Sequence, residues 1–520
     1  MSIFDTRESP KAHPPTGSRE EARRFQELQE TFPEMYRRIF SDPRAERTVV
    51  VVPSMSLDED ELRKIEGVIH YEERMLCLLM LLQLPRTRLV YVTSIPIGPD
   101  VIDYYLHLLP GVPAAHARER LSLVTVGDES LRPLSAKLLD RPEMMSEIAS
   151  LIRDPKSTHL TCFNTTHLER TLAVRWGIPV YGADPALTPL GNKSNSRSIM
   201  RQSGLELPEG YEDLRDRSDI IEAIVALHTS QPDLQRAVVK LNEGFSGEGN
   251  ATLDIGKLKD AVSMEKEADR LLTEELRFEA ADETWDTFES KFAAMGGVVE
   301  SLIEGPNKTS PSVQMRIDPL GGLHVVSTHD QALGGPTGQV FLGCSFPARP
   351  EYRLDLHEAG LAVAKTLKSK GVLGRFGVDF VSVPEGDRWR HYAIEVNLRK
   401  GGTTLPYLML EFLTGGTYDS ELGEFRTSAG AVRTYFASDN VVSESFRGST
   451  PAQLIDAAIY ERIQYRASSQ KGVVFHLLGA VTDYGKLGLV SIALSDVAAS
   501  AQYDDAVKRL KDSPALHQES

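Results

Sequence analysis

Residues 238–250 read VVKLNEGFSGEGN and combine an apolar run, a lysine and a glycine-rich segment. The apolar residues lead up to Lys240, and glycines follow at positions 244, 247 and 249. Backbone N–H groups of such a loop approach phosphate oxygens closely because glycine has no Cβ. Lys240 at a strand end adds a fixed positive charge. The pattern predicts a phosphate-binding loop, although a hairpin or a surface turn uses the same residue types.

The order of these residues argues against the familiar phosphate-binding motifs. A Walker loop carries its lysine directly after the last glycine, whereas Lys240 precedes all the glycines here. A protein-kinase loop has the spacing GxGxxG and precedes its lysine, whereas this chain has the lysine first and then GxxGxG. The first predicted strand continues into VVVPSMSLD (50–58) rather than GxGxxG, which disfavours a dinucleotide-binding domain.

Oxygen-bearing side chains on two predicted strands lie far downstream of the loop. Asp379 stands in GRFGVDF, and Glu395 and Asn397 stand in YAIEVNLRKGG. Residues i and i+2 of a strand share a face, and an antiparallel neighbour can bring Asp379 beside them. Two carboxylates and an amide suit Mg²⁺ that is shared with substrate phosphates. A partly exposed hairpin with ordinary polar residues is the alternative, but a buried carboxylate needs a partner.

Length and composition limit the class of protein. The 520 residues are too many for one ordinary core, and 41% hydrophobic with 25% charged residues is typical of soluble globular proteins. The formal net charge of −16 disfavours nucleic acid and anionic membranes as partners. No apolar run approaches the roughly 20 residues of a bilayer span, and the first residues lack a signal-peptide pattern, so we expect a cytoplasmic protein. The three cysteines form no metal-binding or disulfide pattern and are expected to be buried and inert.

The hydrophobic pattern divides the chain into four regions and predicts an α/β and α+β multidomain fold. Residues 1–45 are expected to form a disordered tail and a helix, and residues 46–190 a largely parallel sheet with crossover helices. Residues 191–415 read as hairpins with helices, including one long charged helix near 257–295. Residues 416–520 form a smaller end piece with a strand pair around TDYG. The strands expected in the second region are 48–52, 89–94, 121–126, 159–163 and 179–182.

Together, these motifs resemble the ATP-grasp superfamily. Lys193, in NKSNSR before a helix ending in SGLELP, matches the first nucleotide lysine of that family, and Lys240 matches the second. VVESLIEGP (298–306) is similar to the linker that crosses the adenine. The resemblance implies ATP as the nucleotide and Mg²⁺ at Asp379, Glu395 and Asn397, as two ions for which Mn²⁺ can substitute. It assigns nucleotide binding to Lys193, Lys240, Glu243, Gly244, Phe245, Ser246, Gly247, Gly249, Glu300, Ser301, Leu302 and Glu304.

The chain departs from the D-alanine ligases of that superfamily in two places. Those ligases carry glutamate in a GPE sequence where this chain has GPN with Asn307, so Glu304 is the substitute expected at the ribose. They also present a lysine to the γ-phosphate, but no lysine occurs here between Lys308 and Lys365. We expect Arg316, in VQMRID, to replace it.

Further candidates for the reacting groups lie beside these motifs. His329 or Gln331 in the HDQALGG loop is expected to assist Arg316. Arg399 follows the metal-binding strand, and its forked guanidinium suits a carboxylate or an acyl phosphate. A basic residue on a surface loop is the alternative interpretation of Arg399.

Residues 48 to about 505 look like the peptide ligases related to the pheganomycin ligase, with YEERMLCLLMLL and EVNLRKGGTTLP among the shared stretches. The resemblance implies a pre-ATP-grasp domain, an ATP-grasp fold and a small C-terminal domain. It implies that ATP drives amide formation between a small-molecule carboxylate and an amino-acid or peptide amine, through an acyl phosphate, in natural product biosynthesis. It also allows a homodimer. An ATP-grasp kinase and a nucleotide-binding regulatory protein without ligase activity remain the rival hypotheses.

Overall fold

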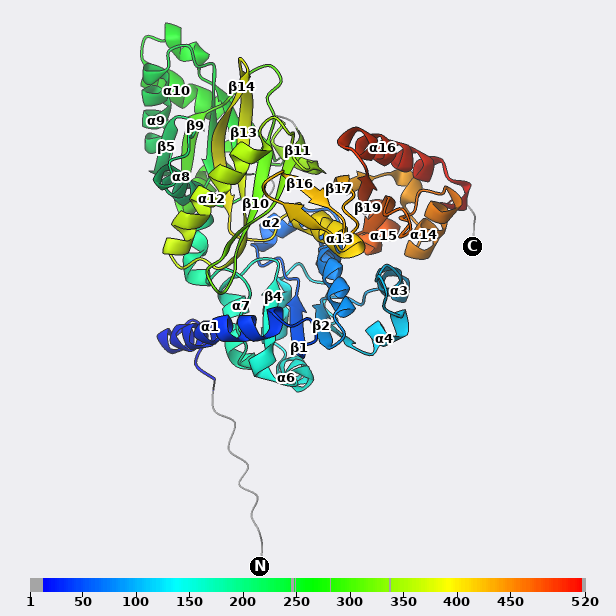
Figure 1. Cartoon of the computed structure of the whole chain (residues 1–520). Coiled ribbons are helices and arrows are strands. Elements are labelled where there is room, and N and C mark those ends of the chain that lie inside the picture. Colours follow the sequence, from blue (N-terminus) through cyan, green and yellow to red (C-terminus); the bar gives the residue numbers. More distant parts are fainter. Residues whose placement is uncertain (1–12, 245–246, 248, 281, 336–337, 517–520) are drawn as a thin grey trace, which may run out of the picture.

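The computed structural model describes residues 13–244, 247, 249–280, 282–335 and 338–516. The N-terminal part lies below a large central part, and the C-terminal part lies beside both (Figure 1). The predicted disordered tail includes residues 1–12, which fall outside the described residues. The helix expected to follow it is confirmed as α1 (Arg19–Phe40), which Ser18 caps by accepting a hydrogen bond from the backbone N–H of Glu21.

The N-terminal part contains a four-stranded sheet in the order β3-β2-β1-β4, and each neighbouring pair is parallel, as the alternating pattern predicts. The strand expected at 179–182 is wrong, because its only ladder contact among the described residues is a bridge between Leu160 and Val180. The elements are β1 (Arg47–Val52), α2 (Glu59–Arg63), η1 (Val68–Gln83), β2 (Thr87–Thr93), α3 (Pro99–His107), α4 (Ala114–Arg118), β3 (Leu121–Thr125), α5 (Leu134–Leu139), α6 (Pro142–Leu151), β4 (Thr158–Cys162) and α7 (His167–Trp176).

A second, five-stranded sheet in the order β5-β9-β6-β7-β8 carries the glycine-rich loop between β6 and β7. The single helix expected at 257–295 is wrong. Ser263 and Thr284 each accept a backbone N–H and so begin separate helices within that stretch. The elements are α8 (Lys193–Gln202), β5 (Gly210–Leu214), α9 (Arg217–Ser230), β6 (Arg236–Leu241), β7 (Asn250–Asp254), η4 (Gly256–Asp260), α10 (Met264–Glu274), β8 (Arg277–Phe278), α11 (Trp285–Met295) and β9 (Gly297–Ser301).

The largest sheet has eight strands in the order β14-β13-β10-β11-β12-β17-β19-β18, all paired antiparallel. The predicted strand pair around TDYG is confirmed as β18 and β19, and β17 joins that pair to β12, so one sheet crosses the boundary expected at 415. The elements are β10 (Pro311–Ile317), β11 (Leu323–Gly334), β12 (Val340–Phe346), α12 (Arg353–Ser369), β13 (Gly374–Glu385), β14 (Arg388–Asn397), α13 (Thr404–Thr414), β15 (Thr417–Asp419), β16 (Glu424–Arg426), β17 (Thr434–Val442), α14 (Pro451–Tyr460), β18 (Gly472–His476), α15 (Val481–Tyr484), β19 (Lys486–Ala493) and α16 (Asp496–Asp512).

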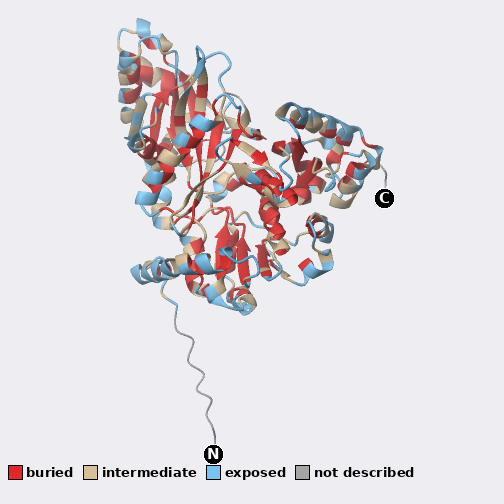
Figure 2. Cartoon of the chain, viewed as in Figure 1, coloured by how far each residue is buried: buried red, intermediate tan, exposed pale blue. Residues whose placement is uncertain are grey.

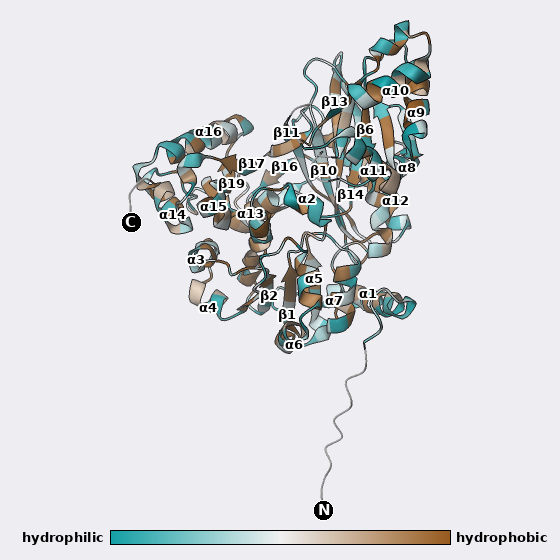
Figure 3. Ribbon diagram, turned by 180° about the vertical axis from the view of Figure 1, so that it is seen from behind, coloured by the Kyte–Doolittle hydropathy of each residue, from teal (hydrophilic) through white to brown (hydrophobic). Residues whose placement is uncertain are grey.

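One hydrophobic core joins the N-terminal and C-terminal parts. Leu79 of η1, Tyr105 of α3, Leu408 of α13 and Phe475 of β18 belong to the same cluster of buried residues. Buried positions follow the strands and α13, while the outer faces of α1, α10 and α16 are exposed (Figure 2). The view from behind shows the same division, with apolar strands inside and more polar helices outside (Figure 3). This shared core fixes the two flanking parts against each other.

Two expectations from composition can be compared with the fold. Cys77, Cys162 and Cys344 are free and buried, and burial raises the pKa of the Cys77 thiol to about 12. Within the described part of the chain, no helix has both the length and the apolar character needed to cross a membrane.

We expect Phe376→Ala to destabilise the central sheet. The Phe376 side chain is fully buried in the core beneath α12, so its removal leaves a cavity that costs about 3–5 kcal/mol. Urea unfolding followed by far-UV circular dichroism would show a lower midpoint. Tyr460→Ala is the control, because Tyr460 is 66% exposed and its loss should leave the midpoint nearly unchanged. Equal midpoints for Phe376→Ala and the wild type would contradict this packing.

Candidate functional site

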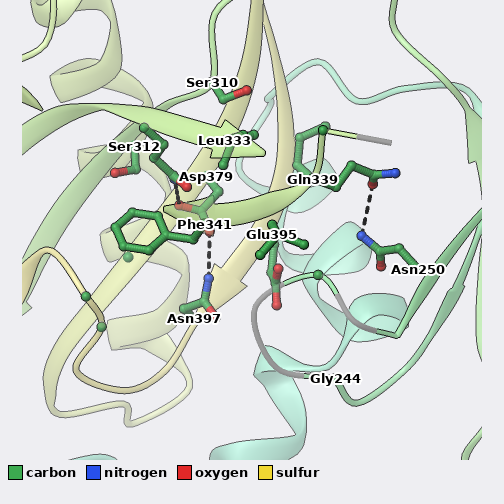
Figure 4. Close-up of a pocket in the computed structure, with 18 of the residues that line it drawn as sticks. Gly244, Asn250, Ser310, Ser312, Leu333, Gln339, Phe341, Asp379, Glu395 and Asn397 are labelled. Atoms are coloured by element: carbon green, nitrogen blue, oxygen red, sulfur yellow. Dashed lines mark hydrogen bonds between the residues drawn. The ribbon is translucent and has the colours of Figure 1, made fainter. Parts of the chain in front are cut away.

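The main cavity has a volume of about 510 Å³ and is lined by residues from all three parts of the chain. The central part supplies the strand faces and the glycine loop, and the N-terminal and C-terminal parts close one end. Figure 4 shows Asp379, Glu395 and Asn397 on one side and Gly244, Asn250 and Gln339 on the other. The cavity therefore lies between the two antiparallel sheets of the central part.

The oxygen-bearing residues predicted on two strands meet in this cavity. Asp379 of β13 lies directly opposite Glu395 of β14, and a register shift follows Asp379. Asn397 donates from Nδ2 to Asp379 Oδ2 at 2.7 Å, and Gln331 of β11 donates from Nε2 to Asp379 Oδ1 at 2.8 Å (Figure 4). The sequence therefore predicted both the pairing of the strands and the shared face.

Burial affects the two carboxyl groups differently. Burial, and then the charge of Glu395, raises the pKa of Asp379 to about 7. Burial also opposes ionisation of Glu395, but Lys193 and Arg399 outweigh it and lower the pKa of that carboxyl. Lys193 Nζ lies 2.6 Å from Glu395 Oε1. The amides of Gln331 and Asn397 donate to Asp379, and a cation beside this carboxylate would lower the electrostatic cost of ionising it.

This set of donors fits a hard divalent cation. Mg²⁺ prefers carboxylate and amide oxygens and keeps other positions for water or substrate phosphates. Among the described residues, no group of three or more His, Cys, Asp or Glu side chains could hold a metal ion. An ion at Asp379 and Glu395 therefore needs the Asn397 amide oxygen and oxygens from a bound substrate to complete its ligands.

Two buried lysines face the cavity from separate elements. Lys193 is the first residue of α8, which Asn192 caps by accepting the backbone N–H of Asn195. Lys240, on β6, donates to Glu300 Oε1, and Glu300 Oε2 accepts from Arg197 at 2.8 Å. Each lysine is thus held by a carboxylate in the absence of nucleotide, and phosphate oxygens can replace these partners.

The glycine loop approaches the large sheet closely. A Cβ on Gly247, which has φ +86°, would lie 2.6 Å from the backbone oxygen of Gln339, so only glycine fits there. Asn250 Nδ2 donates to Gln339 Oε1 at 3.0 Å beside it. Gly244 and Gly247 line the cavity, and Glu243 is exposed outside its lining. Phe245 and Ser246, both predicted to bind nucleotide, fall outside the described residues. Gly249 is buried outside the cavity lining, where a Cβ would lie 3.4 Å from the Leu241 side chain.

The linker after β9 lies along the cavity as expected, but its polar groups bind other parts of the protein. Glu300, Ser301 and Leu302 all line the cavity. Both carboxylate oxygens of Glu300 are committed to Lys240 and Arg197, so its side chain does not face a base edge. The N–H groups of Ser301 and Leu302 donate to backbone oxygens of the protein at 2.8 and 3.1 Å. These contacts do not support the expectation that the Glu300 side chain reads the base, and nucleotide binding by the backbone of Ser301 and Leu302 stays a prediction.

Comparison with known proteins supports this geometry. A family model described as IQCH-like ATP-grasp matches residues 186–284 and 278–421. The chain thus contains a segment, residues 186–421, that matches an ATP-grasp family. It is 29% identical to the L-propargylglycine–L-glutamate ligase of Streptantibioticus cattleyicolor over 90% of this chain and 94% of that one. It is also 24% identical to the IQ motif-containing protein H of Danio rerio. That match covers 72% of this chain and 39% of the longer relative.

Solved ATP-grasp structures share the fold across most of the chain. The ADP complex of N5-carboxyaminoimidazole ribonucleotide synthetase superposes with a TM-score of 0.51 at 12% identity, covering 90% of this chain and 98% of that one. Biotin carboxylase from Campylobacter jejuni, in complex with an ATP analogue, gives a TM-score of 0.53 at 14% identity and covers 91% and 95%. The N-terminal and C-terminal parts thus belong to an arrangement that other ATP-grasp structures share.

Three residues predicted for the ATP-grasp site lie elsewhere. Arg316 shares a strand face with Ser312 and Gln314, but it is two residues beyond the end of the cavity lining, about 7 Å further along β10. His329 is fully buried and bonds Tyr435 at 2.7 Å, and burial lowers the pKa of its imidazole to about 3. Glu304 is exposed and is not part of the cavity lining, although it pairs with Arg236, which is. Gln331 alone of the proposed helpers reaches the site.

The sequence analysis missed the residues that close the far end of the cavity. They are Tyr71 and Arg74 of η1, Phe163 after β4, Asp439 of β17 and Lys486 of β19. One signal was present, because Arg74 directly precedes the long apolar run MLCLLMLL (75–82). Such a charge needs a partner when the run is buried. Asp439 and Lys486 carry no comparable signal, because only the folding of distant segments brings them together.

We expect Asp379→Asn to be at least as stable as the wild type above pH 7 in metal-free buffer. The pKa of Asp379 is raised to about 7, above its unfolded value, so its contribution to stability is present at low pH and is lost as pH rises through 7. The neutral amide avoids that loss. Thermal unfolding at pH 5 and pH 8 measures the difference in midpoint between Asp379→Asn and the wild type, and Asp140→Asn, at an exposed position, is the control. A clearly lower midpoint for Asp379→Asn at pH 8 would show that the carboxylate instead stabilises the fold.

Proposed function

We propose that the protein is an ATP-dependent carboxylate–amine ligase that forms an amide bond through an acyl phosphate. The observation that carries this proposal is one cavity in which Asp379, Glu395 and Asn397 face Lys193 and Lys240 across the space between two sheets. The match to a ligase over nearly its whole length supports the same conclusion. The acid is a small-molecule carboxylate, and the amine belongs to an amino acid or a peptide.

The first step transfers the γ-phosphoryl group. A carboxylate oxygen of the acid attacks the γ-phosphorus, the bond to the bridging oxygen of the β-phosphate breaks, and ADP leaves with that electron pair. Charge grows on phosphoryl oxygens, so positioned cations do most of the catalytic work. Lys193 and Lys240 hold the α- and β-phosphates in this scheme. Asp379, Glu395 and Asn397 would hold Mg²⁺, which is expected as two ions and for which Mn²⁺ can substitute. When bound, the metal would neutralise charge on the transferred group.

The second step forms the amide. The neutral amine nitrogen attacks the carbonyl carbon of the acyl phosphate, the carbon–oxygen bond to phosphate breaks, and the nitrogen gives up a proton. Holding both reactants in one cavity supplies much of the rate because the reaction becomes effectively unimolecular. The cavity extends well past the phosphate-binding residues to Phe163 and Lys486, which gives room for the second substrate.

Arg399 is the residue proposed to act on the reacting carboxylate and the acyl phosphate. It follows β14 directly, lines the cavity and lies within the electrostatic influence of both Asp379 and Glu395. Burial lowers the pKa of its guanidinium, while the two carboxylates oppose that shift, and the group stays charged at neutral pH. A guanidinium can bind two oxygens of one planar group, which suits a carboxylate that becomes an acyl phosphate.

The rival hypotheses make different demands on the same site. A kinase would consume ATP with the acid alone, and a regulatory protein would bind ATP without turnover. The decisive experiment incubates the protein with ATP, Mg²⁺ and mixtures of amino acids and short peptides, followed by phosphate assay and product mass spectrometry. We expect ADP, phosphate and a condensed product in equal amounts, only when acid and amine are both present. ADP formation without any amide product would refute the ligase assignment. Light scattering would test separately whether the protein is a homodimer.

We expect Arg399→Ala to lower kcat by about 100- to 1,000-fold, because a positioned donor to a developing charge is worth that much. Arg399→Lys should recover part of the loss, since it keeps the charge without the fork. Steady-state phosphate release gives kcat and KM for each variant. Arg447→Ala, whose side chain is 48% exposed, is the control and should match the wild type. A raised KM with unchanged kcat would mean that Arg399 only binds substrate.

A further inference from the structure

A second cluster of charged residues closes the end of the cavity away from the glycine loop. It consists of Arg74 from η1, Asp439 from β17 and Lys486 from β19, grouped around the ring of Tyr71. These elements come from the N-terminal and C-terminal parts, outside the segment that matches the ATP-grasp family model. The cluster is therefore not accounted for by the binding of ATP or metal.

The contacts within the cluster hold both cations at the cavity wall. Arg74 NH2 lies 3.3 Å from Asp439 Oδ2, and its guanidinium carbon lies 5.0 Å from the Tyr71 ring centroid. Lys486 Nζ lies 5.3 Å from the same centroid and donates to the backbone oxygen of Glu66 at 3.2 Å. The Phe163 ring centroid also lies 5.6 Å from the guanidinium carbon of Arg74. Two aromatic rings therefore pack near this guanidinium and restrict its movement.

Few carboxylates balance the cations of the cluster. Arg74 is 7% exposed and Lys486 is 5% exposed, and Asp439 forms an ion pair with Arg74. The Glu66 carboxylate also acts on Lys486 and lines the cavity, but it is exposed to water, which screens its charge. His476 adds no charge, because burial lowers the pKa of its imidazole to about 4. Two buried cations thus depend on one half-buried carboxylate and one exposed carboxylate, and an anion that enters the cavity would lower the cost of burying them.

The cluster is continuous with the reaction centre. Arg74 and Lys486 line the same cavity as Arg399, Asp379 and Glu395. Cationic side chains thus line this cavity from the carboxylates proposed to bind metal to the junction of the N-terminal and C-terminal parts.

We propose that Arg74 and Lys486 bind a substrate carboxylate that is not consumed in the reaction, with Asp439 positioning Arg74. This inference rests on the proposed ligase function and names the chemistry of one substrate: an α-amino acid or peptide with a free carboxylate. The carboxylate can belong to the amine substrate or to an acid substrate that carries two carboxyl groups. In both cases the guanidinium and the ammonium supply charge-assisted hydrogen bonds, and the Tyr71 ring keeps water from one side of them.

The test compares free carboxylates with carboxamides in the full-length protein. The probes are the twenty proteinogenic α-amino acids and their α-carboxamides, titrated calorimetrically into protein saturated with Mg²⁺ and ADP. For any pair that forms a product, KM is measured for each substrate and for its carboxamide. The variants are Arg74→Gln and Lys486→Met, which keep side-chain length against the Tyr71 ring. The control is Arg447→Gln, whose side chain lies outside the cavity lining.

We expect the wild type to bind the free carboxylate roughly 10- to 100-fold more tightly than the carboxamide, as charged hydrogen bonds imply. Both variants should lose most of that preference, leave the carboxamide KM unchanged and keep the wild-type affinity for ADP. The substrate whose KM responds, acid or amine, identifies the source of the carboxylate.

Several outcomes would overturn the subsite. They are equal binding of carboxylate and carboxamide by the wild type, equal loss of both ligands in the variants, and no binding of any amino acid. Failure of the ligase proposal is distinguishable, because it would appear as amino-acid binding with the predicted discrimination but without amide formation in any mixture. Retained ADP affinity shows that a variant is folded, so a variant that loses it is replaced by the other variant in the comparison.

Discussion

The site depends on two half-buried carboxylates that face each other across β13 and β14. Asp379 and Glu395 lie opposite each other in an antiparallel ladder, where like charges repel. Lys193, from the start of α8, pairs with Glu395, while the amides of Gln331 and Asn397 donate to Asp379. The pKa of Glu395 is lowered, whereas the pKa of Asp379 is raised to about 7. In the proposed function, a metal ion bound with nucleotide would add the positive charge that favours ionisation of Asp379.

A carboxylate also positions the lysine on the facing sheet. Lys240 is paired with Glu300, and Arg197 holds the second oxygen of that carboxylate. Glu300 therefore positions a lysine instead of reading a base. If ATP phosphates replace Glu300 as the partner of Lys240, as proposed, Glu300 would keep Arg197, so this buried carboxylate would not be left unpaired. Such an exchange of anionic partners would let the site bind a polyanion without a large rearrangement of its core.

Much of the fold and of the ATP-grasp site could be predicted because their signals are local. Strand periodicity placed Asp379, Glu395 and Asn397 on a common face, and the lysine-before-glycine order identified the loop. Prediction failed where tertiary contacts decide the outcome. Ser263 and Thr284 break the helix expected at 257–295, and the length of β10 carries Arg316 past the cavity. A pattern gives the face of a strand but not the point at which a cavity ends.

The residues at the far end of the cavity explain why sequence motifs say little about substrates. Arg74, Asp439 and Lys486 meet because one core joins η1, α13, β18 and β19 and so fixes the flanking parts over the central sheets. Proteins of one fold can bind different small molecules, because the residues that line the site decide what is held. In the proposed function the central part binds ATP, and the packing between the two ends of the chain places the charged groups that would hold a substrate.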